Sequence, residues 1–128
     1  MAVSPEFTEH LRDLLGGLGP FTVRRMFGGA GLLLDDAMFA LVADETLYMK
    51  TDAELAQAYA AAGSEPFVYE GKGKGKRIEI SYWRLPDSAL DDPDEALGWA
   101  RQSLVPAERA AAEKRAAKVR KAARKGRG

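Results

Sequence analysis

Lysines near the end of the chain have the spacing that most clearly suggests a binding chemistry. They recur every three or four residues in an Ala/Lys/Arg-rich stretch with strong helix propensity: Lys114, Lys118, Lys121 and Lys125. At about 100° per residue they share one stripe of a helix, opposite Ala112, Ala116, Val119 and Ala123. Such a helix can lie along a phosphate backbone or pack its alanine face on a partner helix, and a solvated, fraying terminus is the alternative.

Two other basic groups are candidates for nucleic-acid or partner binding. Lys72, Lys74 and Lys76 alternate with glycines before Arg77, so the backbone can approach a polyanion while the cations neutralise phosphates. A solvated hairpin whose charge prevents edge-to-edge pairing of the sheet is the alternative for this loop.

Arg24 and Arg25 form the other group, because they stand before a glycine-rich strand start and could grip phosphate or carboxylate. Adjacent strand residues point to opposite faces, so one arginine could instead cover the sheet edge. Gly28, Gly29 and Gly31 do not match a phosphate-binding glycine motif, and we expect them to serve a bulge or close packing.

Aromatic side chains beside the basic loop raise the possibility of base stacking. Tyr82 and Trp83 follow the loop, and an exposed ring there could stack on a nucleic-acid base. Because side chains alternate along a strand, one of the two should lie on each face, and at least one should belong to the core.

Residue types that carry catalysis or bind metals are scarce. The chain has no cysteine, which excludes disulfides and thiolate metal sites, and His10 is the only histidine. No pair of carboxylates stands in a context typical of acid–base catalysis. We therefore assign no catalytic, cofactor-binding or metal-ligating residue and predict a binding module that is not an enzyme.

The charge of the chain is unevenly distributed although its net value is zero. Residues 1–107 carry 10 Lys+Arg and 17 Asp+Glu, a net charge of −7, whereas residues 108–128 carry 9 and 2, a net charge of +7. This asymmetry indicates an interaction tail, with nucleic acid or an acidic protein surface as its partner. The sequence shows neither a secretory signal nor an apolar run of membrane-spanning length, so we expect a cytoplasmic location.

Helix signals occur at three places before the tail. Ser4-Pro5 predicts a helix start, followed by apolar residues at helical spacing up to Gly16. Thr51 with Glu54 forms a capping-box signature for a helix over about residues 52–62. Asp92 and Pro93 begin another helix, which Pro106 should interrupt.

Strand signals fill the intervening segments and predict five strands, near residues 30–34, 37–43, 46–50, 66–70 and 77–84. The order α-β-β-β-α-β-β-α favours a two-layer α+β fold in which helices cover an antiparallel sheet. We expect a domain over residues 1–106 and a basic tail, helical or disordered, over residues 107–128. Large apolar residues in the periodic segments should be buried: Phe27, Phe39, Leu41, Leu47, Ile80 and Leu97.

Several blocks in order resemble the N-terminal domain of the TfoX/Sxy family. They are RRMFGGAGL at 24–32, MFALV at 38–42, LYMK at 47–50, PFVY at 66–69 and SYW at 81–83, with Leu97 and Trp99 beyond them. The resemblance implies a two-layer fold with a five-stranded antiparallel sheet, similar to the type III secretion chaperones. It also implies a role in regulating bacterial DNA-uptake genes, through the transcription machinery. The namesake proteins carry a second, C-terminal domain, and we expect the basic stretch after Pro106 to be too short and too low in apolar content to form one.

Three functions remain open at this point. The first is a regulatory adaptor whose basic elements contact nucleic acid or an acidic partner. The second is a small enzyme or small-molecule binder with a pocket near Arg24, Arg25 and Gly28. The third is a chaperone-like homodimer, suggested only by the fold. A deep pocket with convergent polar groups would favour the second, and an exposed apolar face would favour the first or third.

Overall fold

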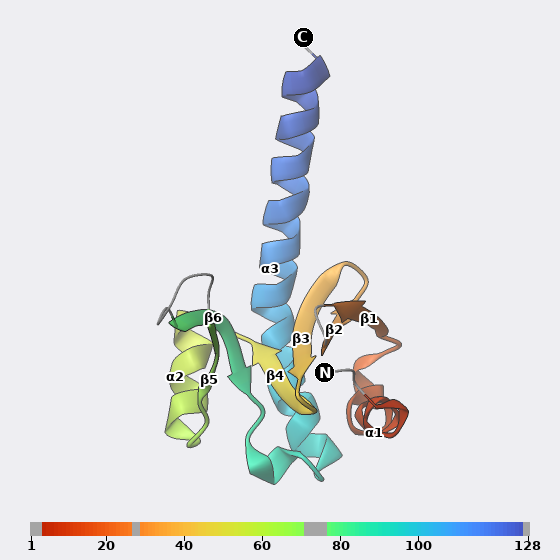
Figure 1. The fold of residues 1–128 in the computed structure, drawn as a ribbon, viewed down its shortest axis with the longest axis vertical. Helices are drawn as coiled ribbons and strands as arrows, with labels where there is room; N and C mark the ends of the chain where they lie inside the picture. The colour runs from red at the N-terminus through yellow and green to blue at the C-terminus, as the bar shows by residue number, and fades with distance from the viewer. Residues whose placement is uncertain (1–3, 27–28, 71–76, 127–128) are drawn as a thin grey trace.

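The computed structural model describes residues 4–26, 29–70 and 77–126. In this part of the chain the helices are α1 (Pro5–Leu15), α2 (Ala53–Ala61) and α3 (Pro93–Gly126), with 3₁₀ turns at Gly16–Leu18 and Asp87–Ala89. The strands are β1 (Thr22–Met26), β2 (Gly29–Leu34), β3 (Ala37–Ala43), β4 (Thr46–Lys50), β5 (Pro66–Glu70) and β6 (Arg77–Arg84). The arrangement is shown in Figure 1.

All neighbouring strands pair antiparallel, in the order β1-β2-β3-β4-β6-β5. The predicted α+β class is confirmed, and the five expected strands are present. Within the described residues the sheet has six strands rather than five. The additional strand is β1, which lies just before the glycine-rich segment. Its two consecutive arginines break the apolar alternation that marks a half-buried strand, and its place at the sheet edge permits this.

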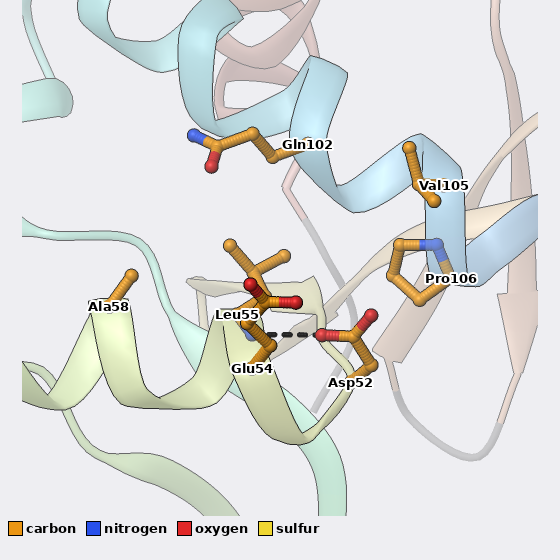
Figure 2. A pocket seen from close by; sticks show the side chains of 7 residues that line it. All are labelled: Asp52, Glu54, Leu55, Ala58, Gln102, Val105 and Pro106. Carbon is orange, nitrogen blue, oxygen red and sulfur yellow. Dashed lines mark hydrogen bonds between the residues drawn. The ribbon is translucent and has the colours of Figure 1, made fainter.

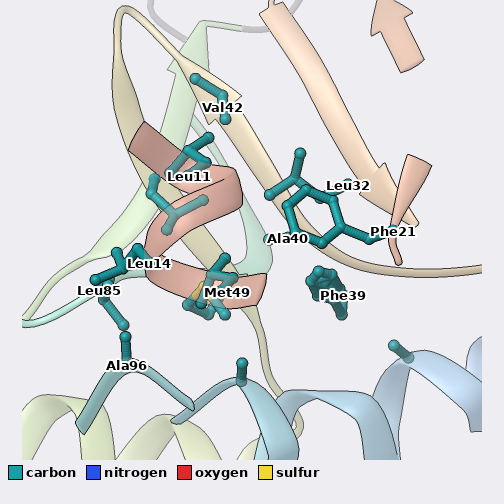
Figure 3. Packing of buried hydrophobic residues seen from close by; sticks show 14 of the residues in the cluster. Leu11, Leu14, Phe21, Leu32, Phe39, Ala40, Val42, Met49, Leu85 and Ala96 are labelled. Carbon is teal, nitrogen blue, oxygen red and sulfur yellow. The ribbon is translucent and has the colours of Figure 1, made fainter. Parts of the chain in front are cut away.

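One hydrophobic cluster joins the helices to the strands. Leu11 of α1, Tyr59 of α2 and Ala100 of α3 all belong to it, together with Phe39 and Met49 of the sheet. Figure 3 shows side chains of α1 and of the sheet meeting above α3. Because the three helices share this cluster, they cover the same face of the sheet and give two layers.

The predicted core residues are buried to different degrees. Phe39 and Leu47 are fully buried, whereas Leu41, Ile80 and Leu97 are half-buried. Phe27 lies outside the described residues. Leu41 is half-buried because it pairs with Tyr48 on the sheet face that the helices leave uncovered.

Side-chain caps begin each helix. The Ser4 hydroxyl accepts from the Phe7 amide, and the Asp92 carboxylate accepts from the amides of Asp94 and Glu95, as the sequence predicts. The predicted cap of α2 was wrong by one residue. Asp52, not Thr51, accepts from Leu55, because Thr51 is buried beneath the start of the helix.

Close backbone packing explains one of the glycines. A Cβ at Gly29 would lie 2.2 Å from the carbonyl oxygen of Val42, so no larger residue fits there without a backbone shift. The expectation of close packing is confirmed at this position. Gly28 lies outside the described residues.

The last helix does not stop at Pro106. It continues to Gly126, although proline lacks the amide that would bond the carbonyl of residue 102. The expected interruption was wrong, because packing outweighs the missing bond: Pro106 is buried, and Ala107 and Ala111 lie in the core. The useful boundary between body and tail therefore falls after Ala111, and residues 112–124 are all exposed.

No helix in the described ranges is long and apolar enough to cross a membrane.

Candidate nucleic-acid interface

The exposed end of α3 carries a dense positive charge. Residues 112–124 contain six cations and one acid, Glu113, which is a net charge of +5. The cations are Lys114, Arg115, Lys118, Arg120, Lys121 and Arg124. Figure 1 shows this half of the helix extending beyond the sheet, with the C-terminus at its far end. Because an α-helix rises about 1.5 Å per residue, these cations are distributed along about 20 Å of exposed helix.

The predicted lysine stripe has a definite orientation relative to the body. At about 100° per residue, Lys114, Lys118 and Lys121 point within about 40° of the direction of the buried Ala107. The stripe therefore prolongs the core-facing side of α3 past the end of the sheet. All three lysines are exposed, while the side chain of Lys125 lies outside the described set.

Two ion pairs fix the root of the projecting segment. The Arg115 guanidinium donates to the Asp36 carboxylate in the turn between β2 and β3, and this hydrogen bond lowers the pKa of Asp36. Nearer the core, Arg109 Nη1 lies 3.6 Å from Asp52 Oδ2 at the start of α2. These two arginines link α3 to the body, whereas the stripe lysines continue the core-facing side of the helix beyond the sheet.

Arg24 and Arg25 are exposed on β1, at the edge of the sheet. Arg24 pairs with Gly31 and Arg25 with Ala30, so their side chains leave opposite faces, as expected. The main sheet contacts of α3 are with β3 and β4, so the structure does not bring the two arginines onto the lysine stripe. They are therefore two separate exposed cations at the sheet edge.

Lys72, Lys74 and Lys76 lie outside the described residues, and Arg77 is described only as the first residue of β6, paired with Glu70.

The aromatic pair next to that loop does fall on opposite faces of the sheet. Trp83 packs against the core cluster. Tyr82 is only 8% exposed, lies beneath the Lys50 ammonium, and donates its hydroxyl to the Met38 carbonyl at 3.3 Å. Burial raises the pKa of Tyr82 to about 12. The expectation that at least one of the two rings is buried is confirmed, and the covered ring of Tyr82 does not offer a free face for stacking.

A groove lies between α2 and α3, on the helical side of the molecule. Its volume is about 360 Å³, and Figure 2 shows its lining: Asp52, Glu54, Leu55, Ala58, Gln102, Val105 and Pro106. This groove is distinct from the pocket considered near Arg24, Arg25 and Gly28. Residue spacing carries no signal for this groove, because its two walls are some fifty residues apart in the chain.

His10 is exposed and its Nε2 lies 3.2 Å from the Leu90 carbonyl oxygen, which agrees with a surface role. The described residues contain no group of three His, Asp or Glu side chains able to hold a metal ion.

The fold and the basic helix together define a two-layer α+β module with a projecting cationic arm, which consists of residues 112–124 of α3. The model of the TfoX N-terminal domain family matches residues 13–107, and the chain belongs to this family. It is 44% identical over 64 residues to the DNA transformation protein TfoX1 of Aliivibrio fischeri (strain ATCC 700601 / ES114), over 50% of this chain and 31% of that protein. It is 30% identical over 77 residues to Protein Sxy of Escherichia coli (strain K12), over 60% and 36%. The alignments thus span about a third of each curated relative.

Proposed function

We propose that this chain is a non-enzymatic regulatory module that binds the phosphate backbone of nucleic acid through the side of α3 that carries the lysine stripe, called the lysine face below. The observation that carries the proposal is the exposure of residues 112–124 together with their net charge of +5. Counterion release from a phosphate backbone would drive this contact, and it depends on the number of cations rather than on the base sequence.

The composition of the arm favours backbone contact over base reading. Alanine, lysine and arginine make up nearly all of it, and it contains no Asn or Gln to read the edges of adenine. We therefore expect little sequence preference from the arm alone, and any selectivity would come from a partner protein. An acidic protein surface is the alternative ligand for the same face.

The relatives guide the biological role. One is named as a DNA transformation protein, and we propose that this chain likewise serves the regulation of DNA uptake, in the cytoplasm. Because the alignments cover about a third of each relative, the chain would supply the module that binds and not the whole regulatory activity.

A matched pair of double variants tests the orientation of the interface. Lys118→Gln/Lys121→Gln and Arg120→Gln/Arg124→Gln each remove two exposed charges from the arm, but only the first pair lies on the stripe. Fluorescence anisotropy with a labelled duplex of about 20 base pairs should show a loss of about tenfold for the lysine pair and about threefold or less for the arginine pair. Equal losses would contradict a defined lysine face, and no binding by the natural chain would end the proposal.

A further inference from the structure

Two exposed valines lie on one side of α3. Val105 is 55% exposed and Val119 is 68% exposed, far above the usual exposure of large apolar side chains in a folded domain. They are fourteen residues apart, which brings them to nearly the same side of the helix, with Ala112 halfway between them. This side is turned about 120–160° away from the buried Ala107 and is therefore the solvent side.

Val105 stands at the mouth of the groove between α2 and α3. Leu55, Ala58 and Pro106 give the groove an apolar lining, and the carboxylates of Asp52 and Glu54 lie along its α2 side (Figure 2). An occupant should therefore present an apolar side chain with a cation beside it. Val119 followed by Arg120 has this chemistry.

We propose that the occupant is a second copy of this chain. The two α3 helices pair antiparallel around Ala112, and Val119 of each copy enters the groove beside Val105 of the other. The two valine-in-groove contacts are equivalent, because one two-fold axis relates the two copies and so generates both contacts. Ala112 at the centre is small enough to allow close approach of the two helices.

Charge complementarity selects the antiparallel direction. In a pair centred on Ala112, two residues are level when they are equally far from it in opposite directions. On one flank of the contact, Glu108 then lies at nearly the same level as Arg115 of the other copy, so that opposite charges face each other. On the other flank Arg120 comes level with the groove, where Asp52 and Glu54 provide carboxylates. A parallel pair would instead place two arms of net charge +5 side by side.

The pairing leaves the lysine stripe accessible. Lys114, Lys118 and Lys121 point toward the side of the buried alanines, whereas the valines point away from it. The dimer therefore carries two lysine faces directed away from the contact between the helices. The inference does not depend on nucleic-acid binding, because the dimer forms through other side chains.

Sedimentation equilibrium of the full chain, without nucleic acid, tests association. We expect the natural chain to be dimeric and Val119→Asp to raise the dimer dissociation constant by at least about tenfold, because the symmetry places the substitution in the interface twice. Ala117→Asp introduces the same charge at an exposed position on the other side of the helix and should change the constant by about threefold or less. A monomeric natural chain, or equal effects of the two variants, would overturn the proposal.

Cysteine cross-linking tests the direction, since the chain has no cysteine of its own. Oxidation of a mixture of Val105→Cys and Val119→Cys chains should give a cross-linked dimer, and Val119→Cys alone should not. Cross-linking of Val119→Cys alone would show a parallel pair and contradict the proposal, as would no cross-link in the mixture. As a further check, Glu54→Arg and Arg120→Glu should each weaken the dimer and should restore it when combined; failure of this rescue would exclude the groove contact.

Discussion

The Arg115 guanidinium bonds the carboxylate of Asp36, 79 residues earlier in the chain, and so joins the projecting half of α3 to the turn between β2 and β3. The turn itself is tight, since Asp35 has a φ of 57°. The exposed arm thus begins at a fixed point on the sheet, which gives its lysine face a defined direction.

Removing the acid at this junction should strengthen nucleic-acid binding. Asp36→Asn deletes a negative charge beside the root of the arm, and we expect the affinity for a short duplex to rise by about threefold at low salt, and less as salt is added. Asp13→Asn, on α1, removes the same charge from another exposed site and serves as the control. Equal gains in anisotropy titrations of both variants would contradict a local effect.

Gly29 should tolerate no side chain. Because its Cβ would meet the Val42 carbonyl oxygen, Gly29→Ala must displace backbone where β2 pairs with β3, and we expect a loss of roughly 2–4 kcal/mol in the free energy of unfolding. Gly16→Ala is the matched control, since nothing lies within 4 Å of the added carbon and its φ is −58°. Urea denaturation should show a change of less than about 1 kcal/mol for that variant.

The turn between β3 and β4 contains avoidable strain. Asp44 and Glu45 have φ values of 51° and 55°, a left-handed conformation that glycine adopts more easily than glutamate. Glu45→Gly should therefore stabilise the hairpin by roughly 0.5–1 kcal/mol, because a two-residue turn of this type favours glycine in the second position. Glu54→Gly, in the first turn of α2, should destabilise the protein in the same thermal melts, and a loss for both would contradict the prediction.

Alkaline unfolding should follow the buried tyrosines. Burial raises the pKa of Tyr82 to about 12 and that of Tyr59 still further, so the folded state resists their ionisation. The stability that depends on protonated Tyr82 is complete below the unfolded pKa of about 10 and is lost as the pH rises toward 12. Tyr82→Phe should make stability fall less steeply between about pH 10 and 12, as measured by urea denaturation at several pH values. An unchanged pH dependence would contradict the assignment.

The sequence predicted the local elements better than the way they meet. Alternating apolar residues located β2 to β6, and the caps at Ser4 and Asp92 were found because capping depends on neighbouring residues only. β1 was missed because Arg24 and Arg25 hide its pattern. The stop at Pro106 was wrong because the contacts of Ala107 and Ala111 with the sheet maintain the helix, and these contacts are tertiary.

The candidate site shows the same limit. Helical spacing identified the lysine stripe, but not its direction, which is set by the burial of Ala107 on the same side of α3. The ion pair between Asp36 and Arg115 and the groove between α2 and α3 join distant parts of the chain, so spacing gave no signal for either. The roles of Lys72, Lys74 and Lys76 stay predictions.

The salt dependence of nucleic-acid binding tests the central claim most directly. If four to six cations of the arm contact phosphates, the logarithm of the association constant should fall by about 4–5 units per logarithmic unit of salt, since each contact contributes about 0.9. A chain truncated after Ala111, which keeps the buried alanines and so the fold, should bind at least about a hundredfold more weakly at low salt. Circular dichroism would verify that the truncated chain is folded. Equal binding by the full and truncated chains, or a salt slope near zero, would contradict the account.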